Sequence, residues 1–167
     1  MDFKDLARAR YSCRTYRSDP VEEEKLAAVL EAARMAPTAC NRQAFQLYVL
    51  GTAERREEMR RLYNRDWLAQ APLVIGIAGE PGHDWVRSDG HNYVDVDCAI
   101  VMDHLILQAA DLGLGTCWIG AFDPAAARRL LDLPAGWEPI AFTPLGYPAE
   151  TGRPKTRKPL EDLVVRR

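Results

Sequence analysis

Both ends of the sequence carry side chains that could bind an anion. Near the start, the stretch RYSCRTYR places Arg10, Ser12 and Arg14 at alternate positions, and near the end the tail contains Lys155 and Arg157. Guanidinium, ammonium and hydroxyl groups are the donors that proteins use for phosphate, and arginine can bind it through two parallel hydrogen bonds. If the two ends meet in the fold, they can form one anion site. If they do not meet, they are two solvated tails.

The charge distribution sets these segments apart from the rest of the chain. Residues 1–17 have five basic and two acidic side chains, and residues 153–167 have six and two. The whole chain has 22 basic and 24 acidic side chains and a net charge of −2, so residues 18–152 hold 11 basic and 20 acidic ones. A nucleic-acid-binding protein is normally basic over a whole face, with aromatic side chains interleaved. We therefore expect a local anion site and no nucleic-acid partner.

Other residue types that carry chemistry show no functional spacing. The four cysteines are far apart and form no CxxC pair, and the three histidines show no ligand pattern. We expect no metal site and no redox dithiol, and we interpret the cysteines as reduced core thiols. Gly113 and Gly115 follow a helix rather than a strand, so a dinucleotide-binding fingerprint is absent.

The elements that must position these residues alternate between helices and strands. Helices are predicted over residues 2–12, 18–38, 52–63, 93–113 and 123–133, and strands over residues 45–51, 72–79, 114–122 and 138–148. Residues 80–92 are predicted as a loop, and residues 163–165 as a possible last strand. This order indicates an α+β or mixed α/β fold. A chain of 167 residues is long enough to bury a core as one domain.

Particular residues mark the faces and ends of these helices. Phe3 and Leu6 are the expected apolar contacts of the first helix, and Ser18 or Asp19 can cap the second, which Pro37 ends. The longest helix, over residues 93–113, is apolar over most of its circumference. Such a helix belongs in a core or an interface.

Four segments, in this order, resemble motifs of the FMN-dependent nitroreductase family. They are RYSCRTY (10–16), APTACNRQAFQLYVL (36–50), LGLGTCWIGAF (112–122) and GRPKTRKPLEDLV (152–164). The resemblance covers essentially the whole chain. It implies an α+β fold, a three-layer α/β/α sandwich with a central mixed, mostly antiparallel sheet and a swapped C-terminal segment. It also implies a homodimer with FMN sites at the interface, each protomer being a single FMN-binding domain over residues 1–167.

The resemblance assigns roles around FMN. Arg10 and Ser12 with Lys155 and Arg157 would surround the phosphate, and Arg14 would face the N1–C2=O edge of the ring, where reduced flavin is anionic. The cofactor-binding residues that it implies are Arg10, Tyr11, Ser12, Arg14, Pro37, Thr38, Ala39, Asn41, Gln43, Asn64, Trp118, Ile119, Gly120, Lys155 and Arg157. No side chain would act as a catalytic nucleophile or a metal ligand, because the chemistry occurs at flavin N5.

Several of these assignments have alternatives. Asn41 and Gln43 would reach the ring or ribityl chain, with residues 37–41 serving the partner's FMN, but they could instead cap the preceding helix. Ile119 and Gly120 would lie against the ring and offer a backbone N–H to N5, with Gly120 allowing the backbone to approach closely. Gly120 could instead be a plain bend at the end of a strand. Asn64 matches only loosely.

The sequence also departs from the family pattern. Ala44 and Phe45 follow Gln43 where proline and tryptophan are usual, and Thr38 replaces serine. Only the loop over residues 80–93 separates the buried strand from the long helix. We therefore expect an open pocket without a helical lid, with Trp85, Arg87 and Tyr93 at its rim.

By resemblance, NADH or NADPH would reduce FMN, and a nitroaromatic, quinone or flavin would then collect the electrons in a ping-pong reaction. Alternatives are an FMN-binding module without turnover and a specialised branch for dehalogenation, flavin or azoline chemistry. No apolar run approaches the roughly 20 residues of a membrane span, and the N-terminus has no signal-peptide pattern. We expect a cytoplasmic protein with no membrane partner.

Overall fold

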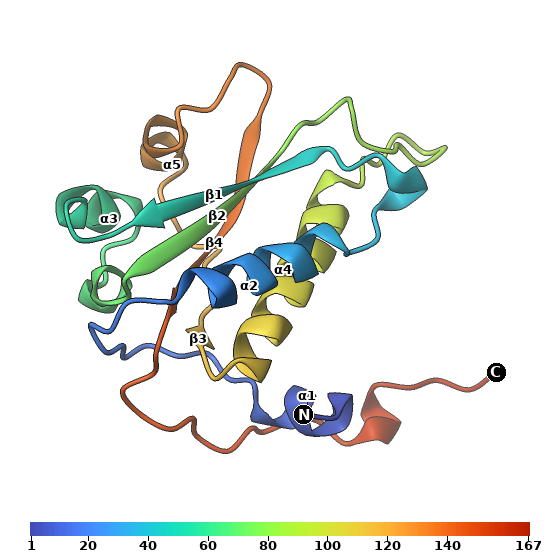
Figure 1. The fold of residues 1–167 in the computed structure, drawn as a ribbon. Coiled ribbons are helices and arrows are strands. Elements are labelled where there is room, and N and C mark those ends of the chain that lie inside the picture. Colours follow the sequence, from blue (N-terminus) through green and yellow to red (C-terminus); the bar gives the residue numbers. More distant parts are fainter.

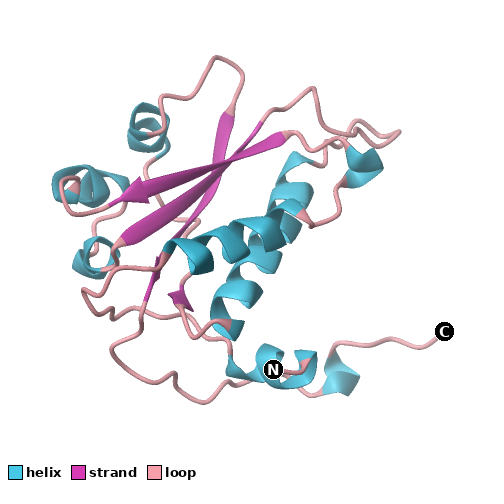
Figure 2. Cartoon of the chain, viewed as in Figure 1, coloured by secondary structure: helices cyan, strands magenta, loops and turns pink.

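The structure, a computed structural model, describes residues 1–167. Helices pack on both faces of one sheet (Figure 1). The strands are β1 (Phe45–Gly51), β2 (Leu73–Gly79), β3 (Gly115–Thr116) and β4 (Glu138–Gly146). The helices are α1 (Phe3–Ala9), α2 (Glu23–Arg34), α3 (Arg56–Leu62), α4 (Val94–Asp111) and α5 (Pro124–Leu130). Short 3₁₀ helices cover Ala39–Asn41, Asp66–Gln70 and Leu160–Asp162. Long loops join several of these elements, as Figure 2 shows.

The sheet has the order β1-β2-β4-β3, and every pair of neighbouring strands is antiparallel. β2 lies at the centre, with Ile75 opposite Val49 of β1 and Thr143 of β4. The N-terminal segment lies beside β3 and forms one parallel bridge with it, between Ser12 and Thr116.

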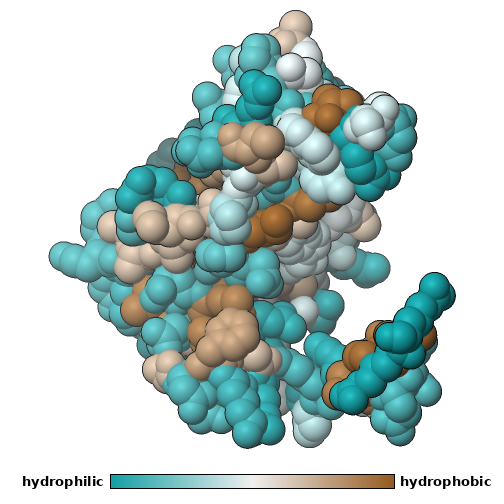
Figure 3. All heavy atoms as spheres, turned by 90° about the vertical axis from the view of Figure 1, so that its right-hand side faces the viewer, coloured by the Kyte–Doolittle hydropathy of each residue, from teal (hydrophilic) through white to brown (hydrophobic).

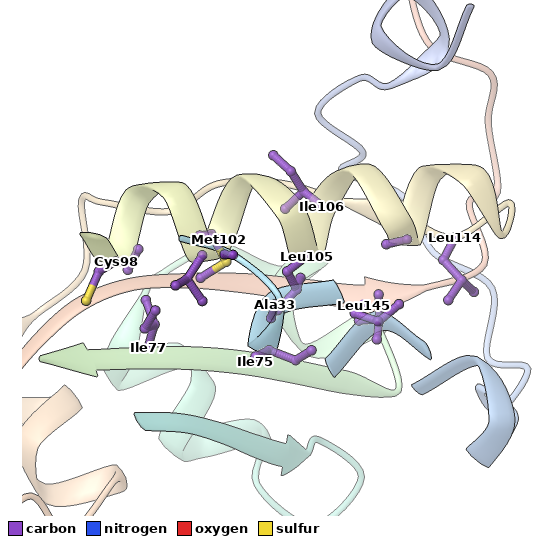
Figure 4. Close-up of a cluster of buried hydrophobic side chains, with 14 of the residues drawn as sticks. Ala33, Ile75, Ile77, Cys98, Met102, Leu105, Ile106, Leu114 and Leu145 are labelled. Carbon is purple, nitrogen blue, oxygen red and sulfur yellow. The ribbon is translucent and has the colours of Figure 1, made fainter. Parts of the chain in front are cut away.

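Two helical layers enclose this sheet. α2 and α4 cover one face, where Val29, Ala33, Met102 and Leu105 pack with Ile75 and other residues of the strands (Figure 4). α3 and α5 cover the other face, where a second cluster forms around Phe142. The expected α+β fold and three-layer α/β/α arrangement are confirmed.

The helix α4 is buried mainly within its own chain. Cys98, Met102 and Leu105 point toward the sheet, whereas Ile106 is buried on the other side of the helix (Figure 4). Only Val96 among its large apolar side chains is clearly exposed. None of the helices combines the length and the apolar character that a membrane span requires.

The strand predicted over residues 114–122 is much shorter than expected. β3 ends at Thr116, because the Cys117 N–H donates to the hydroxyl of Thr143 rather than to a backbone carbonyl. Pairing with β4 resumes only at Ile119, which exchanges two backbone hydrogen bonds with Phe142.

The chain ends differ from three expectations. Neither Ser18 nor Asp19 caps α2, which begins at Glu23, and Asp19 pairs with Arg17 instead. Phe3 is 70% exposed, so it is not an apolar contact of α1 within this chain. Residues 163–165 form no strand, because no other strand lies beside them, and their apolar side chains stay exposed.

Candidate functional site

The N-terminal segment and the C-terminal tail meet in the fold. The Tyr11 hydroxyl donates a hydrogen bond to the Glu150 carbonyl oxygen over 2.6 Å, and the Ala149 N–H donates to the Thr15 carbonyl. Further along the tail, Lys155 Nζ donates to the Ala7 carbonyl oxygen near the end of α1 over 2.6 Å. The sequence left open whether these basic segments come together. In the structure they form one surface.

The stretch around Ser12 is extended and joined to β3. The Cys13 N–H donates to the Thr116 carbonyl over 2.8 Å, and Cys13 is buried against Gly115, where a Cβ atom would lie 2.8 Å from the Cys13 side chain. Side chains of an extended chain alternate between its two faces. Burial of Cys13 therefore leaves Ser12 and Arg14 together on the exposed face.

A cationic pocket of about 520 Å³ lies between these segments. Its lining residues are Arg10, Tyr11, Ser12, Arg14, Thr15, Glu150, Thr151, Gly152, Arg153, Lys155 and Arg157. Five of them are basic and only Glu150 is acidic. A neighbouring hollow of about 740 Å³ shares Arg10, Lys155 and Arg157 and extends along α1. We name the pocket of about 520 Å³ the phosphate pocket, after the anion that the sequence resemblance predicts for it.

The cations of the phosphate pocket form no ion pair within the chain. None of the five basic residues forms a salt bridge. Partial burial lowers the pKa of Lys155, and the nearby Arg10 and Arg157 lower it further. These cations are unpaired, and the arginines destabilise the charged form of Lys155. A bound anion would stabilise that charged form.

The segment after β3 continues from this pocket. Burial raises the pKa of Cys117, while the positive charge of Arg14 and a hydrogen bond from Ser12 oppose that rise. Trp118 follows, 41% exposed, and then the buried Ile119. The Ile119 N–H is already bonded to Phe142, whereas the Gly120 N–H makes no backbone hydrogen bond. Apart from the two adjacent residues, no atom of this chain comes closer than 3.9 Å to a Cβ placed on Gly120.

The other predicted site residues lie away from the phosphate pocket. The segment of residues 37–43 follows α2 at the opposite end of α4 from the N-terminal segment (Figure 1). Asn64 lies exposed between α3 and the 3₁₀ helix Asp66–Gln70. Neither Asn64 nor the 37–43 segment lines the pocket.

The segment of residues 38–43 forms a tight turn. Cys40, Asn41 and Gln43 have positive φ angles of 51°, 54° and 52°, in the left-handed region that residues other than glycine rarely adopt. The Gln43 N–H donates to the Thr38 hydroxyl, and the Gln43 side-chain amide donates to the Asn41 carbonyl. Neither side chain caps α2, which ends at Arg34.

The loop over residues 80–93 is ordered by its own side chains. Asp84 is buried and accepts hydrogen bonds from the Tyr93 and Val94 N–H groups at the start of α4. Trp85 packs edge-on against Tyr93, with ring centroids 4.8 Å apart, and Arg87 lies over the same ring. The three expected rim residues thus form one cluster of two aromatic rings and a guanidinium group, and the loop contains no helix.

Sequence reasoning missed two buried carboxylates at the start of α4, Asp84 and Asp97. Asp97 accepts a hydrogen bond from the Ala39 N–H over 2.9 Å, although 58 residues separate the two. The sequence contains one signal for Asp97. Helical spacing places Asp97 on the same face as the apolar Cys98 and Val101, where an acidic residue is unusual.

Comparisons with known proteins agree with this architecture. The model of the nitroreductase family matches residues 7–65 and 53–147. A solved nitroreductase family protein from Clostridium difficile 630 is 38% identical, with a TM-score of 0.89, and the match covers 99% of this chain and 98% of that chain. An NADH dehydrogenase from Thermus thermophilus is 29% identical over 99% of this chain and 96% of its own length. An FMN reductase [NAD(P)H] from Bacillus subtilis is 31% identical over 90% of this chain and 67% of its own length. The chain therefore belongs to the nitroreductase family.

Proposed function

We propose that this protein is an FMN-dependent oxidoreductase that takes electrons from NADH or NADPH and passes them to a small-molecule acceptor. A nitroaromatic compound, a quinone or another flavin fits that role. Relatives named FMN reductase [NAD(P)H] and NADPH-dependent oxidoreductase support the cofactor and the electron donor. The observation that carries the proposal is the phosphate pocket, which both chain ends build from unpaired cations and a hydroxyl group.

The residues of this pocket fit the phosphate of FMN. A phosphate monoester is a compact dianion that needs several charge-assisted donors. Arg10, Lys155 and Arg157 supply the cations, and Ser12 supplies a hydroxyl between them. Tyr11 packs against the tail at Gly152 and closes the pocket wall. Residues 1–167 are proposed to act as one flavin-binding domain.

The next residues along the chain fit the flavin ring. Arg14 lines the same pocket two residues beyond Ser12, and its charge would favour an anionic ring edge. The free Gly120 N–H, rather than that of Ile119, is the backbone donor available to a ring nitrogen. Trp118 offers an exposed aromatic face beside it. Bound FMN would supply the hydride acceptor, and these residues would orient it and bias its charge.

A homodimer would complete the site. Asn41 and Gln43 carry polar groups suited to a flavin, yet within one chain they lie away from the phosphate pocket. The tail also leaves Leu160, Leu163 and Val165 exposed. Figure 3 shows hydrophobic side chains on an arm that projects from the body. A second protomer that covers this arm would bring its 37–43 segment to the first protomer's FMN. This arrangement corresponds to a swapped C-terminal segment.

The colour and redox behaviour of the purified protein test the proposal. A yellow protein that bleaches anaerobically with NADH or NADPH, and recovers its colour with a quinone or a nitro compound, is expected. Parallel titrations with the two nucleotides establish which donor is used. A colourless protein that cannot be reconstituted with FMN would overturn the proposal. A yellow protein that neither nucleotide bleaches would instead indicate a binding module without turnover.

A further inference from the structure

Asp97 is a buried carboxylate with one oxygen in use and one free. It is 4% exposed, its Oδ1 atom accepts the hydrogen bond from the Ala39 N–H, and its Oδ2 atom has no partner. Burying an ionised carboxylate costs free energy unless nearby donors or dipoles compensate. Asp97 lies in the first turn of α4, where the helix dipole favours negative charge.

The single hydrogen bond of Asp97 falls on the least regular backbone of the chain. Ala39 opens the turn in which Cys40, Asn41 and Gln43 adopt left-handed conformations. Each such residue carries a conformational cost and persists only when its surroundings hold it in place. Thr38 braces the turn from within, through its hydroxyl and its carbonyl oxygen. Asp97 is the side chain that anchors it from outside, on the rigid helix α4.

We infer that Asp97 is a positioning residue that fixes the 38–43 turn and thereby holds Asn41 and Gln43 in the orientation that a flavin requires. This inference rests on the proposed function for its flavin, but the anchoring of the turn does not. Asp97 itself does not touch the reacting atoms.

Two substitutions at Asp97 separate its acceptor from its charge. Asp97→Asn keeps an oxygen for the Ala39 N–H and should retain FMN affinity close to that of the wild type. Asp97→Ala removes the acceptor and should weaken FMN binding on the order of tenfold, the effect of one hydrogen bond to a charged group. Asp103→Asn, an exposed acid on the same helix, is the matched control.

The rate of hydrogen exchange at the Ala39 amide measures directly whether its hydrogen bond to Asp97 is formed, with or without flavin. The amide should be protected in the wild type and in Asp97→Asn, and should exchange rapidly in Asp97→Ala. If Asp97→Ala does not fold, Ala39→Pro removes the donor instead, since Thr38 is extended and Ala39 opens a 3₁₀ helix, both compatible with proline. That variant should also weaken FMN binding.

The outcomes are distinct. Loss of protection together with weaker FMN binding supports the inference. Unchanged protection of the Ala39 amide, or lost protection with unchanged FMN affinity, overturns it. A wild-type protein that protects this amide but takes up no FMN would overturn the proposed function and the flavin role of Asp97, and leave Asp97 as a structural anchor alone.

Discussion

Tyr11 and Glu150, 139 residues apart in sequence, are joined by a hydrogen bond from the tyrosine hydroxyl to the glutamate carbonyl oxygen over 2.6 Å. Beside this bond, Gly152 lies so close to the Tyr11 ring that a Cβ atom would be 2.4 Å from it. The contact brings the cations of the tail opposite those of the N-terminal segment. The phosphate pocket therefore depends on a contact that contains no charged side chain.

Removing two cations from opposite sides of the phosphate pocket should release the cofactor. Arg10→Ala combined with Arg157→Ala should weaken FMN binding on the order of a hundredfold, because each arginine supplies a charge-assisted hydrogen bond. Fluorescence quenching of FMN on titration with apoprotein measures this change. Arg17→Ala is the control, since Arg17 is paired with Asp19 outside the pocket. Equal affinity in the double variant and the control would place the phosphate elsewhere.

A methyl group on Gly152 should displace the tail. Gly152→Ala puts its Cβ into the Tyr11 ring, so the tail must move away and FMN binding should weaken roughly tenfold, in line with the usual cost of overpacking. Gly51→Ala adds the same methyl group in open space and should leave the affinity unchanged. The comparison is made by FMN titration, with thermal unfolding as a check on folding. Unaltered affinity in Gly152→Ala would show that the position of the tail does not affect the cofactor.

The affinity for FMN should fall in mildly alkaline solution. The lowered pKa of Lys155 means that its charged form is disfavoured in the empty pocket. At low pH, where the lysine is charged, this lowers the free energy of unfolding. This destabilisation disappears as pH rises through the lowered pKa toward its ordinary value of 10.5. Bound phosphate favours the charged lysine, so binding takes up protons and weakens as pH rises through the lowered pKa.

Titrations from neutral pH up toward the ordinary lysine pKa value of 10.5 test this dependence. Lys155→Arg keeps its charge over the whole range, so its affinity should fall less than that of the wild type. A parallel decline in the two proteins would exclude Lys155 as the titrating group.

Replacing Arg14 should change the reduction potential of bound FMN more than it changes the affinity for FMN. Replacing it by glutamine removes a positive charge from the expected position of the reduced ring, so the two-electron midpoint potential should fall on the order of 30 mV. Spectroelectrochemistry of the reconstituted protein measures the potential, and Arg17→Gln is the control. A potential unaffected by Arg14→Gln would argue that this guanidinium is not near the ring.

The sequence predicted most of the fold, because its signals were local. Val29 and Ala33 are buried on α2 as their spacing predicts, and β2 coincides with an apolar run bounded by proline and glycine. The short β3 could not be anticipated, since its end depends on the hydroxyl of Thr143 in another strand. The exposure of Phe3 could not be anticipated either, because it depends on whether another part of the fold packs against this side chain, and within a single chain none does.

The candidate site was predictable only in part. Arg10, Ser12, Arg14, Lys155 and Arg157 were grouped by resemblance, and the structure brings all five into one pocket. The contact between Tyr11 and Gly152 that unites them is non-local and leaves no pattern in either segment. Asp97 was missed because its partner is a backbone amide, which any residue type at position 39 other than proline would provide.

The joining of the two chain ends also has a consequence for biosynthesis. During translation the sheet and both of its helical layers can assemble from residues 1–146, whereas half of the phosphate pocket is supplied only by residues 150–157. A chain truncated before Glu150 would retain its core yet lack three of the five pocket cations. With the phosphate bound as proposed, flavin content therefore measures how many molecules in a preparation are both folded and synthesised through to the tail.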